Sequence, residues 1–508
     1  MSFSIRARRI KIVAGVILAA LAIAGVVIAT HWPFTRASVV EGLEQTFAGT
    51  VEVKGFRATY FPAGCVMVGV TLRRNTDGPA IATADRVTIQ GSYLGFFTFP
   101  KRIPRIKVEG LRILASPQSE RAGNQVLPAR TDETRAVVGE INADGAVAEF
   151  ASGEAGAAPL KFEIHKLTLN GVGHDRAMAF HAALRNPVPP GEIRTDGQFG
   201  PLRRDDPGKT PASGEYVFEQ ADLGVFPAIG GTLSSTGKFG GVLEQLEVAG
   251  NTDVPNFEVD RSPHAVRLKT EFAATVNGMD GSVALKSVRV EFGKTSLRVH
   301  GEIAGKAGAA GKTVALDGTQ QQGTIQDWLR LLAKAEHPAM EGPMTFRAQA
   351  QVPPGERQFI ERVNLQGDFV IGSADFTKPS TQKQVDNLSQ VAMGGKPMSD
   401  EAPPIGVEAN MKGHVEMKNA IATFTDFYFG VPGALAHVHG TYGILTEKID
   451  LHGDLRVDSK LSKGATGIKA VLLKVAEPFF KKKKQGEIVP IKVGGTFSDP
   501  TYGLDVVK

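Results

Sequence analysis

The chain has 508 residues, a formal net charge of +5 and one cysteine, Cys65. Its charge is too small to favour nucleic acid as a partner, and a single cysteine excludes an intrachain disulfide. About 475 residues follow the only uniformly apolar segment, which is enough for one elongated body or a large core.

The first predicted element is a membrane anchor. Ile12 to Ala29 is an uncharged apolar run of about 18 residues, long enough to cross a bilayer as a helix. The preceding residues 1–11 are basic, so the positive-inside rule places them in the cytoplasm and the rest of the chain outside. A cleaved signal peptide also begins with basic residues, but its apolar core is usually only ~7–15 residues long. We therefore predict a retained anchor over residues 12–30.

Residues 31–115 are predicted to form a short helix followed by hairpins. Thr35 can begin a helix that Gly49 ends, with Val39 and Leu43 on one apolar face. Such a helix is expected to lie as a lid on the first strands. Cys65 follows a Gly, as in a lipoprotein acylation site, but it lies far beyond the apolar run, which favours a buried structural cysteine.

Beyond this helix the hydrophobic period changes to two, which predicts strands with one apolar and one polar face. The apolar positions that illustrate it are Ile106, Val108, Val288, Val290, Ile449 and Leu451. Their polar neighbours Lys107, Arg289 and Asp450 should point to the opposite face. Glycines are spread along the chain at turns, so we predict a mainly β protein built of antiparallel meanders.

One unit recurs along the chain. The segment FGGVLEQLEVAG, Phe239 to Gly250, aligns without gaps to YGILTEKIDLHG, Tyr442 to Gly453. An aromatic residue followed by Gly, a Glu, two alternating apolar residues and a closing Gly occur at the same offsets. The two segments are therefore predicted to be hairpins of one architecture.

Three regions depart from the strand pattern. Residues 116–158 predict an exposed, loop-rich insertion with one weak strand pair near Val137 to Phe150. In the central β-rich body, residues 159–410, helical spacing predicts two helices that cover the sheet locally. The second is Ser380 to Met393, and the first is Thr324 to Ala335, with an apolar face of Ile325, Trp328, Leu329 and Leu332. In the C-terminal region, residues 411–508, an amphipathic helix is predicted at Ser462 to Lys484.

The last of these helices ends in four lysines, Lys481 to Lys484. Two interpretations remain open. Lysines at a helix C-terminus complement the helix dipole and stay solvated, whereas contact with anionic lipid headgroups is the functional alternative. A solvated run is favoured because charge runs usually form solvated faces.

The sequence gives no sign of an active site, a cofactor or a metal centre. His437 and His439 are the only close pair of histidines, and two ligands alone do not make a zinc site. Asp205 and Asp206 precede Pro-Gly and are typical of a turn. Nucleophile-elbow, zinc-protease and phosphate-loop motifs are all missing, so the chain is not expected to be an enzyme.

Several segments resemble the AsmA-like proteins, which are inner-membrane-anchored periplasmic proteins related to the bridge-like lipid transfer proteins. The resemblance runs the whole length of the chain. It is carried by SVVEGL at Ser38 to Leu43, the hairpin segment Ala82 to Ile113, LRNPVPPGEIRTDGQFGP at Leu184 to Pro201, ADLGVFPAIGGTLSSTGKFGG at Ala221 to Gly241, GHVEMKNAIATFTDFYFGVPGALAHVHGTYG at Gly413 to Gly443, Glu477 to Phe480, and VPIKVGGTFSDPTYGLDV at Val489 to Val506.

The resemblance implies an elongated, strongly curved antiparallel sheet with an apolar trough, a few short capping helices and an N-terminal transmembrane helix. It also implies a bacterial inner-membrane protein that moves phospholipid or supports outer-membrane biogenesis. Its implied partners are membrane lipids, and other cell-envelope proteins stay open as partners. Its motifs are structural, so no site residues carry over.

The apolar face of such a sheet must be buried by protein or by a ligand. The six apolar positions named above, Ile106, Val108, Val288, Val290, Ile449 and Leu451, are the candidate lipid-groove residues. A face sealed by helices and loops is the alternative. Two other classes stay open: a scaffold or assembly factor for outer-membrane proteins that uses strand edges, and a periplasmic hydrolase with a polar cluster in a pocket.

Overall fold

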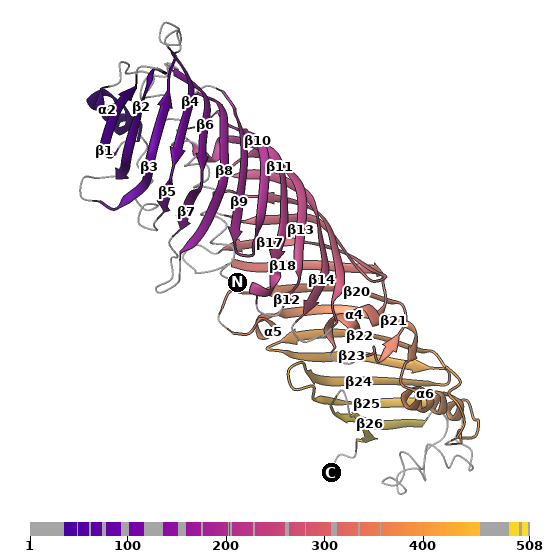
Figure 1. The fold of residues 1–508 in the computed structure, drawn as a ribbon. Coiled ribbons are helices and arrows are strands. Elements are labelled where there is room, and N and C mark those ends of the chain that lie inside the picture. The colour runs from indigo at the N-terminus through magenta and orange to yellow at the C-terminus, as the bar shows by residue number, and fades with distance from the viewer. Residues whose placement is uncertain are drawn as a thin grey trace.

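The computed structural model describes residues 35–505 except 48, 60–61, 74–77, 93–100, 116–135, 151–158, 174–175, 202, 204–205, 227–228, 260–263, 280, 306–311, 334–335, 356, 400, 458–486 and 497–499. The described residues form one hydrogen-bonded sheet of 27 strands with a few short helices, so the mainly β prediction is confirmed (Figure 1). The predicted anchor, residues 12–30, and the helix predicted at Ser462 to Lys484 lie outside these residues. None of the helices within the described residues is long and apolar enough to cross a membrane.

The elements follow one another in chain order. The helices are α2 (Arg36–Phe47), α4 (Ile325–Leu332), α5 (Phe359–Arg362) and α6 (Pro379–Ala392), with short 3-10 turns η2 (Pro207–Lys209) and η3 (Leu223–Val225). The strands are β1 (Thr50–Thr59), β2 (Gly64–Arg73), β3 (Ala80–Gln90), β4 (Lys101–Glu109), β5 (Arg112–Ala115), β6 (Ala136–Asp144), β7 (Ala146–Phe150), β8 (Leu160–Val172), β9 (Met178–Pro187), β10 (Pro190–Phe199), β11 (Pro211–Asp222), β12 (Ile229–Gly230), β13 (Thr232–Val242), β14 (Gln245–Val259), β15 (Val266–Val276), β16 (Val283–Phe292), β17 (Thr295–Gly305), β18 (Lys312–Gln322), β19 (Met340–Glu341), β20 (Met344–Val352), β21 (Asn364–Phe376), β22 (Ala409–Lys418), β23 (Ile421–Val431), β24 (Ala434–Gly443), β25 (Ile449–Val457), β26 (Glu487–Gly495) and β27 (Pro500–Leu504).

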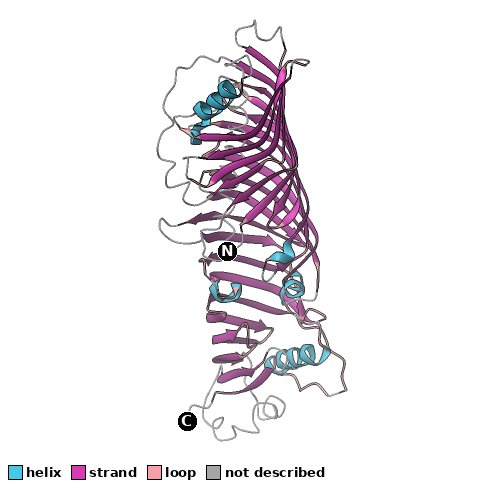
Figure 2. Ribbon diagram, turned by 60° about the vertical axis from the view of Figure 1, so that its left-hand side comes forward, coloured by secondary structure: helices cyan, strands magenta, loops and turns pink. Residues whose placement is uncertain are grey.

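Most strands pair with their sequence neighbours in antiparallel register, as meanders require. The strands stack along the long axis of the molecule, and the sheet curls so that β17 and β18 lie behind β9 to β13 (Figure 1). Figure 2 shows the same sheet bending along its length, with α2 near one end and α6 near the other. Adjacent twisted strands accumulate such coiling when many of them share one sheet.

Two strand pairs correct the all-antiparallel prediction. Strand β4 pairs with β6 in parallel, and β5 pairs with β7 in parallel. A parallel pair needs a connection of a dozen or more residues to return the chain to the starting end. Residues 116–135 separate β5 from β6 and are long enough for that return. The sequence pattern has no feature that distinguishes this crossover from a long hairpin loop.

The range 116–158 is also corrected, because part of it belongs to the sheet and not to an exposed insertion. Val138 and Ile141 of β6 are fully buried in the main apolar cluster. Strands β6 and β7 do not pair with each other; both pair with β8, and Gly145 separates them with φ of 67°. A left-handed glycine lets the strand change direction without steric cost, so the pair predicted near Val137 to Phe150 is one interrupted strand.

Helix α2 has the predicted position at the start of the sheet. Val39 and Leu43 are buried against β1 and β2. The helix also covers the outer edge of β1: Arg36 Nη2 donates to Val53 O at 2.7 Å, and Glu44 Oε1 accepts from Val51 N at 3.0 Å. Cys65 is fully buried, as predicted, and burial raises the pKa of its thiol to about 12. The N-terminal end of the sheet is therefore capped.

The two repeat segments are hairpins, as predicted, but their registers differ. Phe239 of β13 is opposite Val248 of β14, whereas Tyr442 of β24 is opposite Ile449 of β25. The second hairpin thus has the longer turn. In both, the alternating apolar residues lie on the same face of the sheet, because a shift of two residues preserves the side to which a side chain points.

Candidate functional site

The register places the six candidate groove residues on one face of the sheet, called here the apolar face. Ile106 and Ile449 are joined by an unbroken row of cross-strand partners, which share a face by definition of the pairing. The row runs through Ile106, Ile141, Leu169, Phe180, Gly197, Gly214, Phe239, Val248, Ala274, Leu285, Gly301, Leu316, Ala350, Leu365, Met417, Ala422, Tyr442 and Ile449.

A second row joins Val288 to Leu451 in the same way. It passes through Val288, Val299, Gly318, Ala348, Gly367, Val415, Phe424, Gly440 and Leu451. Val290 and Val108 lie two residues from members of these rows and therefore on the same face. Neither row contains a charged side chain. At about 4.8 Å per strand, the first row follows a contour of roughly 80 Å along the sheet.

Exposure divides the six candidates into two groups. Ile106 and Val108 are each 3% exposed and belong to the apolar cluster that also contains the α2 residues. In contrast, Val288, Val290, Ile449 and Leu451 are partly exposed. The apolar face is thus closed at its N-terminal end and more open along the later strands, a difference that periodicity alone does not report.

Aromatic rings and glycines alternate along the open part of this face. Phe369 of β21 lies over Gly413 of β22, where an added Cβ would be 3.1 Å from its ring. The same ring packs against Phe424 and Phe427, at centroid distances of 6.4 and 5.9 Å. Glycine in mid-strand weakens a sheet, but it lets a ring lie flat across the neighbouring backbone. At these points no side chain projects far from the apolar face.

Helix α4 covers one rim of the apolar face. Trp328 packs edge-on between Phe292 and Phe346, at centroid distances of 5.1 and 5.3 Å, and its Nε1 donates to Gln320 Oε1 at 2.8 Å. Asp327 is buried and accepts from the backbone of Lys294 and the hydroxyl of Thr295. These contacts fix the rotation of the helix.

The rotation of α4 corrects one detail of the sequence prediction. Leu332 was expected on the buried side of the helix but is 53% exposed, whereas Leu331 is 7% exposed. The reason is the inward position of Asp327, which is not one of the residues of the predicted apolar face. An acidic residue next to a tryptophan in the first turn is the sequence signal for this arrangement.

Helix α6 covers the same rim further along the sheet and is held by a buried carboxylate. Asp386 is fully buried and accepts from the backbone nitrogens of Ile405, Gly406 and Val407 at 2.6, 3.2 and 2.7 Å. Gln382 Nε2 donates to it as well, at 2.8 Å. Burial alone would raise the pKa of Asp386, but the hydrogen bonds together hold it below its usual value.

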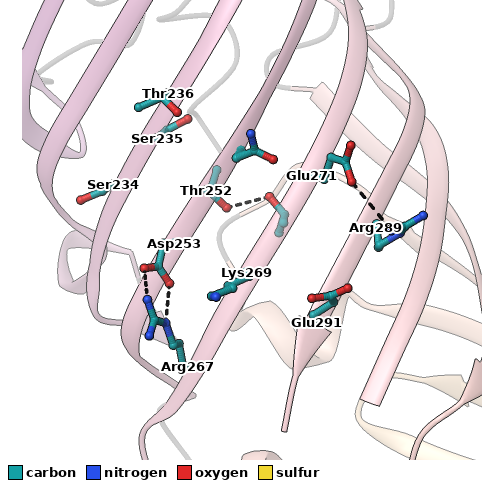
Figure 3. A pocket seen from close by; sticks show the side chains of 12 residues that line it. Ser234, Ser235, Thr236, Thr252, Asp253, Arg267, Lys269, Glu271, Arg289 and Glu291 are labelled. Carbon is teal, nitrogen blue, oxygen red and sulfur yellow. Dashed lines mark hydrogen bonds and ion pairs between the residues drawn. The ribbon is translucent and has the colours of Figure 1, made fainter. Parts of the chain in front are cut away.

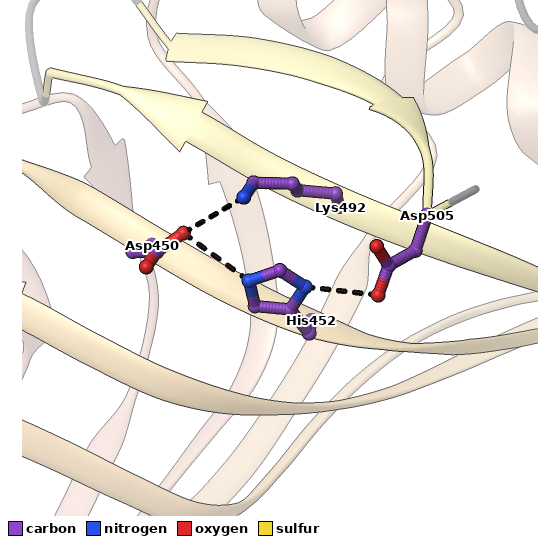
Figure 4. A network of polar contacts seen from close by, with 4 residues as sticks. All are labelled: Asp450, His452, Lys492 and Asp505. Carbon is purple, nitrogen blue, oxygen red and sulfur yellow. Dashed lines mark hydrogen bonds and ion pairs between the residues drawn. The ribbon is translucent and has the colours of Figure 1, made fainter. Parts of the chain in front are cut away.

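The opposite face of the sheet carries charge pairs, and the predicted polar neighbours lie there. Lys107 pairs with Glu109 at 2.6 Å, and Arg289 with Glu271 at 3.9 Å. Asp450 accepts from Lys492 at 3.1 Å. This hydrogen bond and a second one to His452 hold the pKa of Asp450 below its usual value. His452 lies between Asp450 and Asp505, so this network ties β25, β26 and the residue after β27 together (Figure 4).

No protein-family model, curated protein or solved structure matches this chain.

The described residues contain no group of three or more side chains that could hold a metal ion. His437 stacks on Tyr428 at 4.3 Å between ring centroids and contacts Asp426 at 3.1 Å. His437 is exposed on the polar face, as is its neighbour His439.

A hollow of about 410 Å³ lies against β13 to β16 (Figure 3). Nine of its twelve lining residues belong to the polar face. Asp253 receives two hydrogen bonds from Arg267, at 2.9 and 2.6 Å. Arg289 pairs with Glu271 at 3.9 Å, so two of the cations that line the hollow are matched by carboxylates.

Proposed function

We propose that this chain is an envelope protein of the AsmA-like kind that moves phospholipid along the apolar face of its sheet, in support of outer-membrane biogenesis. In this proposal residues 12–30 hold it in the inner membrane. The open part of the apolar face, from β9 to β25, serves as a trough for acyl chains. The headgroups remain in water at the edge of the trough. The rows contain no charged side chain, so they would not select one headgroup over another.

The observation that carries this proposal is the combination of continuity, neutrality and exposure. Apolar rows run through consecutive strands without a charge, and their middle members are partly exposed. A large exposed apolar surface is costly in water and normally meets a partner. Acyl chains fit such a surface because they need only apolar contact and can slide without breaking hydrogen bonds.

One observation weighs against a scaffold that works by strand addition. The outer edge of β1 is occupied by α2, through the bonds of Arg36 and Glu44 described above. Strand β27, at the other end, is five residues long. Covered or very short edges are ways in which proteins avoid pairing with further strands. The edges therefore favour the lipid proposal.

A photo-crosslinking amino acid at Val288, Val290 or Leu451 is expected to capture phospholipid in the native membrane. The same amino acid at Arg289 or Asp450 is expected to capture little or none, because these side chains point to the polar face. Arg289 is the matched control, since it lies between two test positions on one strand. Mass spectrometry of the adducts gives the measurement, and equal capture from both faces would contradict the proposal.

The anchor is tested separately. Replacement of residues 1–30 by a cleavable export signal should release the body from the membrane fraction while its circular dichroism stays that of a β protein. The reason is that this segment contains the only uniformly apolar run of the chain. Continued sedimentation of the washed body with inner membranes would show that another part of the chain binds the bilayer.

A further inference from the structure

One stretch of the apolar face presents hydroxyl groups. Ser235, Thr252 and Thr270 are cross-strand partners on β13, β14 and β15, and Tyr216 on β11 reaches Ser235. The same row continues through Phe218 on one side and Val290 on the other. The hydroxyls therefore interrupt a row that is apolar on both sides.

The four hydroxyls form two pairs. Tyr216 Oη is 3.1 Å from Ser235 Oγ, and Thr252 Oγ1 is 2.6 Å from Thr270 Oγ1 (Figure 3 shows the second pair). Each pair contains two hydroxyl protons and its internal bond uses one of them, so each pair keeps a second proton. Because Ser235 and Thr252 are directly opposite, the two pairs are adjacent, with Cβ atoms about 5 Å apart.

The side chain of Tyr216 lies along the surface of the apolar face. A Cβ on Gly237 would lie 2.7 Å from the tyrosine ring, and one on Gly250 would lie 3.0 Å from its oxygen. The ring therefore lies over two glycines and keeps the face low. Burial raises the pKa of Tyr216, so the hydroxyl stays protonated at neutral pH. Tyr216, Thr252 and Thr270 are partly exposed, whereas Ser235 is 6% exposed.

The chemistry of this cluster selects an uncharged acceptor. Lys269 and Arg289 line the same hollow as Thr252 and Thr270, but the strand register points their side chains to the polar face, so a phosphate on the apolar face would meet no cation. An ester carbonyl oxygen accepts hydrogen bonds, has no charge and is covalently joined to an acyl chain. Two spare protons side by side suit the two esters of a diacyl lipid.

We propose that these four hydroxyls, the hydroxyl station, bind the ester carbonyls of a diacyl lipid whose chains lie on the apolar face. This rests on the proposed function and names its substrate class: ester-linked diacyl lipids in preference to ether-linked ones. A lipid sliding along the face pauses at the station, because there it gains hydrogen bonds that the apolar rows do not offer.

The test compares diester phosphatidylcholine with its diether analogue of equal chain length, both offered to the detergent-solubilised full chain with a photo-crosslinker at Val288. The wild type should capture the diester about two- to tenfold better, the range expected for one net hydrogen bond. T252V/T270V removes one of the two spare protons, so it should lower the diester preference and leave diether capture unchanged.

Thr195→Val is the matched control. Thr195 lies on the same face, opposite Tyr216, but its hydroxyl already donates to Glu215 O at 2.9 Å, so the diester preference should persist. If the double variant fails to fold, Tyr216→Phe removes the partly exposed hydroxyl of the first pair. Only the buried hydroxyl of Ser235 then remains there, so the preference should fall. Equal capture of both lipids by the wild type would overturn the station alone. Capture of neither lipid would overturn the proposed function and the station with it.

Discussion

Aspartate at Val290 is expected to abolish lipid capture while the sheet stays folded, whereas aspartate at Ile106 is expected to unfold the N-terminal end of the sheet. Val290 and Ile106 lie on the same face, but Val290 is partly exposed whereas Ile106 is only 3% exposed. A carboxylate on an accessible surface remains partly hydrated. A carboxylate in a closed core loses its water and costs several kcal/mol.

Unfolding in denaturant, followed by circular dichroism and limited proteolysis, measures the stability of both variants. We expect a loss of about 4 kcal/mol or more for Ile106→Asp and about 1–2 kcal/mol for Val290→Asp. Ser287→Asp is the matched control, because it places the same carboxylate at an exposed position of β16. An equal loss of stability in Ile106→Asp and Val290→Asp would mean that the apolar face is sealed along its whole length. The lipid proposal would then be wrong.

Removal of the Asp386 carboxylate is expected to release helix α6 from the rim. In Asp386→Ala the backbone nitrogens of Ile405, Gly406 and Val407 lose their acceptor inside the protein. Unsatisfied buried donors are costly, so we expect a loss on the order of 3 kcal/mol in the stability of this region. Faster hydrogen exchange of α6 and of residues 405–407 measures it, and unchanged exchange would contradict this account.

The same carboxylate predicts a dependence on pH. Its pKa is lower in the folded protein than in the unfolded chain, so its ionisation stabilises the fold above the unfolded value of about 3.9. This stabilisation is lost as the pH falls through the folded-state pKa. Exchange of α6 should therefore rise below about pH 4 in the wild type. In Asp386→Asn, which does not titrate, this acid-dependent component should be absent.

Local pattern was sufficient for three of the four described helices and for the side to which strand residues point. Val39 and Leu43 at helical spacing predicted α2, and the positions of α4 and α6 followed from the same kind of signal. Alternation predicted that Val288 and Val290 share a face and that Arg289 points away from it. Helical and strand periods are properties of neighbouring residues, so they can be read without knowledge of the rest of the chain.

Contacts between distant segments were outside the reach of that pattern. The parallel pairing of β4 with β6 depends on where the chain returns after residues 116–135. The burial of Asp327 and Asp386 depends on donors more than fifteen residues away, at Lys294 and at Val407 respectively. A sequence pattern places an aspartate in solvent by default. Its burial is favourable only when donors from distant segments form hydrogen bonds with the carboxylate.

The sequence by itself therefore determined a mainly β chain with a two-sided strand pattern, its capping helices and the apolar identity of the six candidate residues. Only the tertiary structure decided that Ile106 and Val108 are closed in while Val288, Val290, Ile449 and Leu451 are partly open. It also brought Tyr216, Ser235, Thr252 and Thr270 into one cluster. The physical reason is that periodicity fixes which way a side chain points, whereas exposure and cross-strand proximity depend on register and on what packs above the face.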